Sequence, residues 1–93
     1  MPFVRESGWL EFNDVNVLRT PEEYGVCELA DESQKVNLVA GGVIKRLLYE
    51  LLGRHPARLF RYTVAVTDVA SEALARKRGA ELGVEVRLLR MEG

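Results

Sequence analysis

The most informative part of the sequence is residues 25–52, GVCELADESQKVNLVAGGVIKRLLYELL. Apolar residues alternate with other residues across 26–31 and again across 35–40, which is the period of a half-buried β-strand. Only a short polar turn separates the two segments, so we predict an antiparallel hairpin. From 43 to 52 the apolar residues fall on one half of a helix, and Gly53 follows as a helix-ending residue. The stretch therefore predicts a strand–strand–helix unit.

The residues that follow extend this unit. Residues 59–67 alternate with period two and predict a third strand whose even-numbered side chains share one face. Asp68 is a suitable N-cap for a helix over 69–82, which Gly83 would end. Residues 84–89 alternate again and predict a last strand. The expected fold is α/β of the α+β type, with a small, mostly antiparallel sheet in β-β-α-β-α-β order and helices packed on the sheet.

The N-terminal part, residues 1–24, is predicted to be an extended lead-in with one helical turn. Residues 8–12 alternate weakly, and residues 15–18 are interpreted as extended. Residues 20–23, TPEE, combine a capping threonine, a proline suited to the first helical position and a glutamate that completes a capping box. The helical turn is therefore expected there.

Composition indicates one globular domain over residues 1–93. The chain is 47% hydrophobic and 29% charged, and 93 residues leave no room for two independent cores. Within this single domain, the core region is predicted at 25–83 and a terminal strand at 84–93. No window approaches the roughly 20 apolar residues that cross a bilayer, so no membrane contact is expected.

Cysteine and histidine each occur once, as Cys27 and His55. A single cysteine cannot form a disulfide within the chain, and one residue of each type argues against a zinc site. This usage fits a reducing, cytoplasmic compartment. Cys27 on a strand is interpreted as a buried thiol, and His55 beside a proline as a surface residue.

Charge is divided unevenly along the chain. Residues 1–34 hold eight acidic and two basic residues, whereas residues 35–93 hold six acidic and eleven basic residues. The two parts therefore carry net charges of −6 and +5 within a total of −1. Such a domain can present a basic face to phosphate, although ion pairs across the fold would produce the same distribution.

The core region resembles GIY-YIG nuclease domains. Members of that family carry a strand beginning Gly-Ile/Val-Tyr, a second strand ending Tyr-Ile/Val-Gly, and then a helix with an arginine in its first turns. The order of elements from 25 to 83 is similar. The corresponding motif positions here are Gly25, Val26, Cys27, Leu38, Val39, Ala40 and Arg46.

The departures from the family pattern determine what the resemblance implies. The family's two motif tyrosines, which help to activate water, are replaced by Cys27 and Leu38. An ungapped alignment puts Lys77 at the family's metal-binding glutamate, and only a shifted register offers Glu72 or Glu81. A lysine there would repel a divalent cation. The resemblance therefore implies a degenerate domain with no cofactor, and Mg²⁺ or Mn²⁺ would be needed only by an active enzyme.

Three functions follow from these observations. The first is a catalytically silent binding or interaction module, with nucleic acid as the candidate ligand. Its candidate contacts are Lys45, Arg46, Arg61 and Lys77. The second is an active metal-dependent endonuclease using Arg46 with Glu72 or Glu81. The third is an unrelated α/β protein–protein module whose last strand pairs across a homodimer.

The resemblance also predicts how three side chains are arranged in space. Cys27, Leu38 and Arg46 should converge where a phosphate-cleaving pocket would lie. Two aromatic residues are further candidates. Tyr49, on the polar face of the 43–52 helix, is a candidate for stacking on a base, although a partly exposed aromatic residue is the commoner interpretation. Trp9 is interpreted as a lid over a small core.

Overall fold

The predicted order of strands and helices from the hairpin onward is present in the structure, which confirms the expected fold class. A computed structural model describes residues 6–89 of the chain. Its elements in chain order are β1 Leu10–Glu11, α1 Asp14–Leu18, β2 Tyr24–Ala30, β3 Val36–Val43, α2 Ile44–Leu51, β4 Leu59–Val64, α3 Asp68–Leu82 and β5 Glu85–Leu88.

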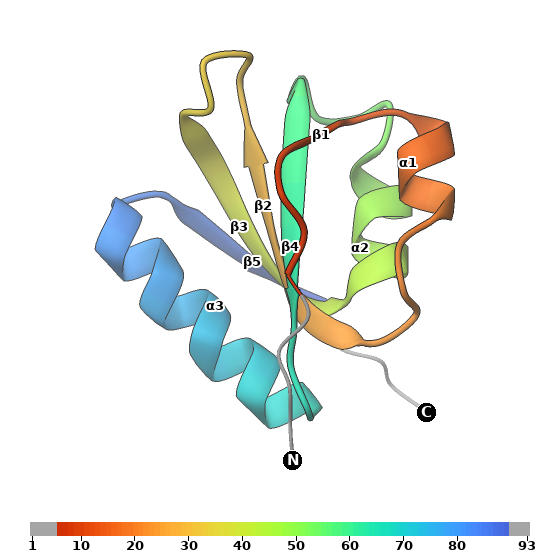
Figure 1. Ribbon diagram of the computed structural model, residues 1–93. Helices are drawn as coiled ribbons and strands as arrows, with labels where there is room; N and C mark the ends of the chain where they lie inside the picture. The colour runs from red at the N-terminus through yellow and green to blue at the C-terminus, as the bar shows by residue number, and fades with distance from the viewer. Residues whose placement is uncertain (1–5, 90–93) are drawn as a thin grey trace.

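A five-stranded mixed sheet in the order β1-β4-β2-β3-β5 forms the middle layer. The pairings of β1 with β4, β2 with β3 and β2 with β4 are antiparallel, and only β3 and β5 pair in parallel. Helix α3 covers one face of the sheet, whereas α1 and α2 lie on the other face (Figure 1). The domain therefore has two separate helix-covered sides.

The β2–β3 hairpin is the centre of the sheet. Within the hairpin, Cys27 lies opposite Ala40. The turn between the two strands is stabilised by Asp31, whose carboxylate accepts hydrogen bonds from the backbone N–H groups of Ser33 and Lys35. Strand β3 runs through Gly41 and Gly42 rather than ending before them. Gly42 has a φ of +147°, and a Cβ there would lie 2.6 Å from the carbonyl oxygen of Leu89, so a side chain is excluded.

Helix α2 forms as its apolar pattern predicts and supplies much of the main core. Its four buried side chains are Ile44, Leu47, Leu48 and Leu51. They pack against the sheet residues that point to the same side, including Leu29 and Phe60. Burying four such side chains contributes on the order of 10 kcal/mol of gross hydrophobic stabilisation.

A second, smaller core lies under α3. Val26 and Val39 point to this side of the sheet and meet Ala75 of the helix. Small residues along α3 permit the close approach: a Cβ on Gly79 would collide with the side chain of Val86 in β5. Gly83 ends α3 in the left-handed conformation, as predicted.

The predicted position of the helical turn in the N-terminal lead-in is wrong. The helix spans Asp14–Leu18, most of which was interpreted as extended, and residues 20–23 are not helical. Asn13 caps α1 by accepting the N–H of Asn16, and Val17 is buried. The Thr20 hydroxyl donates to the Val17 carbonyl at the C-terminal end of α1, and it does not cap a helix over residues 20–23 as predicted.

The third strand and the last strand are shorter than predicted. β4 ends at Val64, so Val66 does not share the buried face and is 76% exposed. Thr67 caps α3 by accepting the N–H of Ala70, and Asp68 is the first helical residue rather than the cap. The terminal segment 84–93 is a strand over Glu85–Leu88, and residues 90–93 lie outside the described part.

Within residues 6–89, no helix is long and apolar enough to span a membrane.

Candidate functional site

The positions equivalent to the motif tyrosines lie inside the main core. Cys27 is 0% and Leu38 is 1% exposed, and both contact the apolar side chains under α2. Burial, together with the nearby charge of Glu28, raises the pKa of the Cys27 thiol above its ordinary value. The thiol is therefore protonated at neutral pH, and neither position can touch a phosphate.

The remaining motif positions have packing roles. Val26 and Val39 belong to the small core under α3, and Ala40 belongs to the main core. Gly25 lies where α2 approaches β2, because a Cβ there would be 2.6 Å from Ile44 Cδ1 and closer still to the Thr63 carbonyl oxygen. The sequence Gly-Val-Cys is thus explained by close packing.

The expected convergence of Cys27, Leu38 and Arg46 does not occur. Arg46 is exposed on α2, about 150° around the helix from the centre of its buried face. The two core residues lie on the sheet side of that helix. The prediction of a shared pocket is wrong because the helix itself separates the arginine from the core.

The four candidate nucleic-acid contacts lie on opposite sides of the sheet. Lys45 and Arg46 belong to α2, while Lys77 is exposed on α3 and Arg61 extends from β4 on the α3 side. They do not form one surface. Their placement divides the predicted set into an α2 pair and an α3-side pair.

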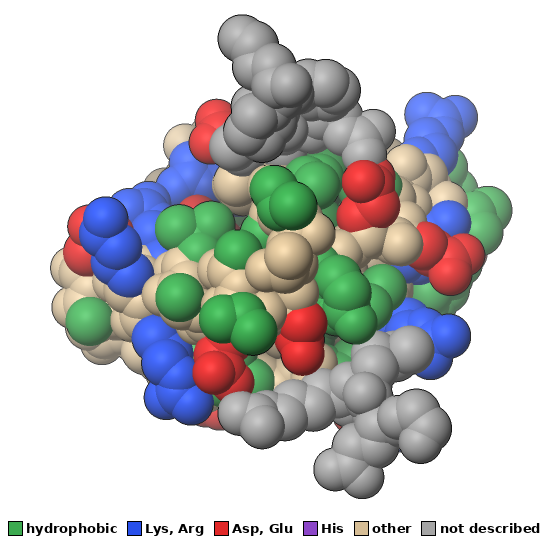
Figure 2. Space-filling model, turned by 90° about the horizontal axis from the view of Figure 1, so that it is seen from below, with side chains coloured by type: hydrophobic (Ala, Val, Ile, Leu, Met, Phe, Trp, Pro, Cys, Tyr) green, Lys and Arg blue, Asp and Glu red, His purple; other side chains and the backbone are tan. Residues whose placement is uncertain are grey.

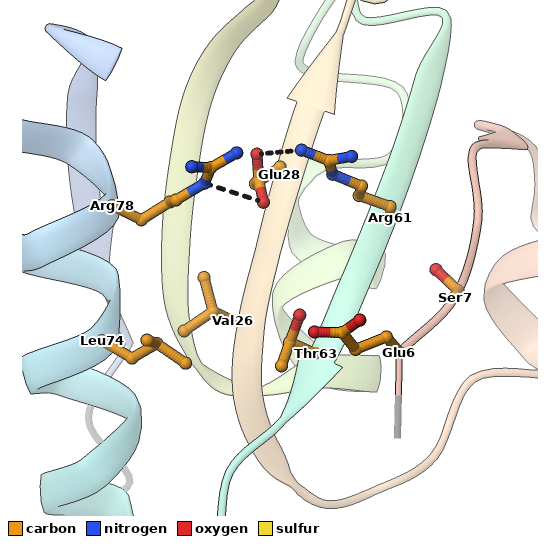
Figure 3. Close-up of a pocket in the computed structure, with 8 residues that line it drawn as sticks. All are labelled: Glu6, Ser7, Val26, Glu28, Arg61, Thr63, Leu74 and Arg78. Atoms are coloured by element: carbon orange, nitrogen blue, oxygen red, sulfur yellow. Dashed lines mark hydrogen bonds and ion pairs between the residues drawn. The ribbon is translucent and has the colours of Figure 1, made fainter. Parts of the chain in front are cut away.

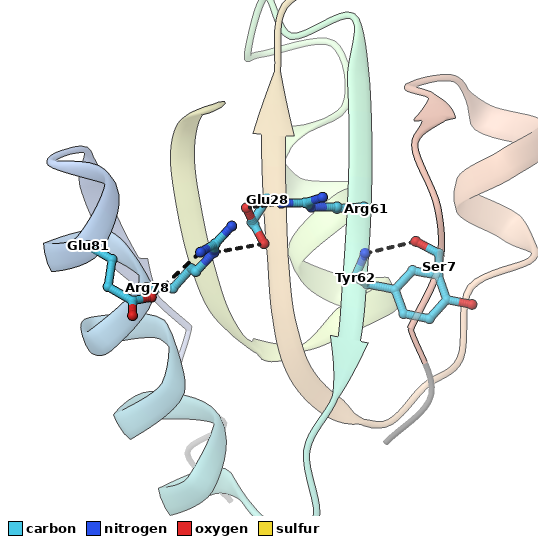
Figure 4. Close-up of polar contacts among 6 residues, drawn as sticks. All are labelled: Ser7, Glu28, Arg61, Tyr62, Arg78 and Glu81. Carbon is cyan, nitrogen blue, oxygen red and sulfur yellow. Dashed lines mark hydrogen bonds and ion pairs between the residues drawn. The ribbon is translucent and has the colours of Figure 1, made fainter. Parts of the chain in front are cut away.

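A buried carboxylate organises the α3 side. Glu28 is 8% exposed, and each of its oxygens binds one arginine: Oε1 lies 3.1 Å from Arg61 Nη2, and Oε2 lies 3.3 Å from Arg78 Nε (Figure 4). Arg78 also pairs with Glu81 at 3.5 Å. These contacts raise the pKa of Arg78, chiefly through its hydrogen bond with Glu28.

Sequence reasoning missed this cluster. Neither Arg78 nor Glu28 was among the residues predicted from the sequence to form a site. Glu28 lies directly opposite Arg61 in the β2–β4 pairing. The sequence did contain one signal. Glu28 is a charged residue between two core residues, Cys27 and Leu29, so strand alternation places it on the opposite face of the sheet.

A cleft of about 300 Å³ adjoins the cluster, between α3 and the chain before β1 (Figure 3). Helix α3 packs on β2, β3 and β5, which leaves β4 uncovered on this side. The residues lining the cleft are Glu6, Ser7, Val26, Glu28, Arg61, Thr63, Leu74 and Arg78. Its two arginines are bound to Glu28, and Arg61 is also stacked over Trp9, with Cζ 4.4 Å from the ring centroid.

The domain can now be compared with known proteins. Residues 1–81 match the family described as Domain of unknown function (DUF7508). The chain belongs to this family. The matched range stops near the end of α3, before β5. No curated protein and no solved structure matches the chain. The description of the DUF7508 family states no ligand or reaction.

The acidic candidates for a metal do not gather in this DUF7508 domain. Glu72 lies 4.0 Å from Arg76, and Glu81 pairs with Arg78, all on α3. Among residues 6–89, no three His, Cys, Asp or Glu side chains come close enough together to hold a metal ion. His55 accepts the N–H of Ala57 through Nδ1, and burial lowers the pKa of its imidazole. The described histidine is therefore held by local packing.

The lower end of the domain exposes some apolar side chains. Val66 and Val69, at the junction of β4 and α3, are among the most exposed large hydrophobic residues. Viewed from this end, hydrophobic side chains are interrupted by polar groups and backbone and are bordered by charged residues (Figure 2). They form no single continuous patch in that view.

Proposed function

We propose that this DUF7508 domain is a degenerate relative of GIY-YIG domains that binds nucleic acid without cleaving it, through the outer face of α2. The proposal places the protein in a cytoplasmic compartment. The element order from β2 to α3, on which the resemblance rests, supports the kinship, and the buried, non-phenolic side chains at the positions of the two motif tyrosines support the absence of cleavage. Because Cys27, Leu38 and Arg46 do not converge, the proposed kinship rests on element order and includes no shared catalytic pocket.

The observation that carries the proposal is the composition of the outer face of α2. Lys45, Arg46 and Tyr49 are adjacent there at helical spacing, and Tyr49 is 45% exposed. None of the described residues forms an ion pair with Lys45 or Arg46. Two cations available for phosphates beside an exposed aromatic ring are the groups that single-stranded nucleic acid requires.

The α3 side is less suitable for phosphate. Arg61 and Arg78 are both bound to Glu28, and a phosphate would have to displace that carboxylate. Doing so would leave a buried charge without its partners, which is costly. Lys77 is the exposed cation that remains from the predicted set on this side, so it serves as the comparison for the α2 pair.

The test is binding of a labelled single-stranded oligonucleotide at several salt concentrations. Two phosphate contacts predict a slope of log K against log salt of about −1.4 on a single strand. The Lys45→Ala/Arg46→Ala variant should lose most of this slope and bind at least about tenfold more weakly at low salt. Lys77→Ala should bind as the wild type does. Equal losses in the two variants, or no binding by the wild type, would refute the proposed surface.

Cleavage is tested separately with a plasmid and a branched duplex in Mg²⁺ or Mn²⁺. We expect no nicking above background. Metal-dependent nicking that disappears in Arg46→Ala would instead establish an active endonuclease. Its metal ligand would not be Glu72 or Glu81, because these residues lie on α3, across the sheet from Arg46 (Figure 1).

The protein–protein module is favoured by one specific feature, the open edge of β5. No strand within the described residues pairs with its outer side. A homodimer or another protein could add a strand there. This function is compatible with nucleic-acid binding, because α2 and the outer edge of β5 are different parts of the surface.

A further inference from the structure

Strand β5 lies at the edge of the sheet with one side unpaired. It pairs in parallel with β3, from Glu85 opposite Leu38 to Leu88 opposite Gly41. Of residues 6–89, none continues the sheet beyond it. An edge of this kind presents N–H and C=O groups that another strand can bind.

The direction of these groups follows from one hydrogen bond. The N–H of Leu89 donates to the Gly41 carbonyl at 2.9 Å, so the backbone groups of residue 89 point toward β3. Since backbone groups alternate along a strand, those of Arg87 and Glu85 point the same way. The N–H and C=O groups of Val86 and Leu88 therefore point outward from the sheet.

We propose that β5 pairs with β5 of a second copy of this chain, antiparallel, on a two-fold axis that passes between the two Val86 residues. The two valines then exchange both backbone hydrogen bonds. These two backbone bonds join the two sheets into one continuous sheet.

The side chains select this register. With Val86 on the axis, Glu85 of one copy lies opposite Arg87 of the other, at the closely spaced non-hydrogen-bonded position. Both side chains are accessible, with exposures of 64% and 53%, and they form a 3.3 Å ion pair within one copy. Centring the axis on Arg87 would place like charges together, so the sequence Glu-Val-Arg is complementary only to the proposed pairing.

The layers leave room for the second copy. Helix α3 packs mainly on β2 and β3 and less on β5, and α2 packs on β2 and β3 from the other side. Both helices are therefore centred away from the outer edge of β5. The Val86 side chain points toward α3 and packs against Gly79. It therefore does not block the backbone of a second strand at the two-fold axis.

The expected dimer is weak. One pair of four-residue strands buries less than the roughly 1,200–2,000 Å² of a standard stable interface. Association should therefore appear only at high concentration, as a mass rising from one chain toward two. Strand β5 lies beyond the range matched by the family, so the pairing is inferred for this chain alone.

The experiment is sedimentation equilibrium of the full chain over a wide concentration range, with charge reversals at the edge. Glu85→Arg places two pairs of like charges across the axis and should weaken association at least about tenfold. The Glu85→Arg/Arg87→Glu variant restores every opposite-charge pair and should dimerise within about threefold of wild type. Arg76→Glu, a charge reversal of the same size and opposite sign on α3 away from the edge, should have no effect.

A second variant keeps the test independent of charge. Val86→Pro removes an N–H that the pairing with β3 does not use, so it should abolish the dimer while the monomer keeps its circular dichroism spectrum. The inference is overturned if the wild type stays monomeric at millimolar concentration, if Glu85→Arg dimerises normally, or if the double reversal does not rescue. Since Lys45→Ala/Arg46→Ala should leave the mass unchanged, failure of nucleic-acid binding and failure of dimerisation are separate results.

Discussion

At the scale of single residues, Glu28 is a buried carboxylate that is paired on both of its oxygens. A charge buried in a strand costs several kcal/mol unless it is paired and hydrogen-bonded. Arg61 from β4 and Arg78 from α3 provide that pairing from two elements. The cluster therefore fixes how α3 lies on the sheet, in addition to neutralising the carboxylate.

Removing one of these arginines should destabilise the fold. Arg78→Ala leaves Glu28 with half of its hydrogen bonding, and we expect the free energy of unfolding to fall by about 1–2 kcal/mol, since Arg78 itself is partly exposed. Arg76→Ala removes only a 4.0 Å pair on the outer surface and should cost less than about 0.5 kcal/mol. Urea denaturation measures both. Equal losses would show that Glu28 has no special need for its partner.

Cys27 gives a prediction in alkaline solution. Its pKa is raised in the folded state above the ordinary value of 9.0, so the unfolded chain loses the thiol proton first. The stability that the protonated Cys27 thiol gives the folded state is therefore fully present below about pH 9. It is lost as the pH rises above that value, by up to about 1.4 kcal/mol per pH unit. The free energy of unfolding should fall with this slope in the wild type and less steeply in Cys27→Ala. Parallel slopes would contradict the assigned cause.

At the scale of elements, the β2–β3 turn contains a strained residue. Gln34 has a φ of +69°, which costs a residue with a Cβ about 1–2 kcal/mol. Gln34→Gly should remove this strain, and after the added freedom of the unfolded chain is subtracted we expect a gain of about 0.5–1 kcal/mol. Thermal unfolding measures the change. Ser33→Gly is the control and should destabilise, because it removes the hydroxyl that donates to Asp31 and adds freedom to the unfolded chain.

The helices and strands that the sequence predicts well are those with a long, regular pattern. Helix α2 repeats its apolar residues at helical spacing over eight residues, and strand β4 has Phe60, Tyr62 and Val64 at every second position. Helix α1 has only five residues, and its alternating valines resemble a strand. The Asn13 cap and the burial of Val17 outweigh that local preference, and neither is visible without the neighbouring elements.

The site was harder to predict than the fold because it depends on how distant segments meet. Glu28 and Arg61 are 33 residues apart, and only the register of β2 against β4 places them opposite each other. Arg46 was correctly placed on a helix after the hairpin, but its position on that helix faces away from Cys27. Matching residue types to a motif did not determine which face each side chain occupies.

At the scale of the whole molecule, the sheet divides the basic residues into two groups. On the α3 side, Arg61 and Arg78 neutralise Glu28, an acid from the negatively charged first part of the chain. On the α2 side, Lys45 and Arg46 have no such partner among the described residues. The uneven charge of the sequence is thus partly used within the fold, and the proposed ligand contacts come from the part that is left over.

The proposed contacts are tested most directly by a titration of the isotopically labelled protein with a short single-stranded oligonucleotide, followed by amide chemical shifts. The account predicts that the largest shifts fall on α2, Ile44–Leu51, and that they diminish as salt is added. Amides of β5 and of the Glu28 cluster should stay unchanged. Shifts confined to α3 and the cleft, or no shifts at all, would contradict it.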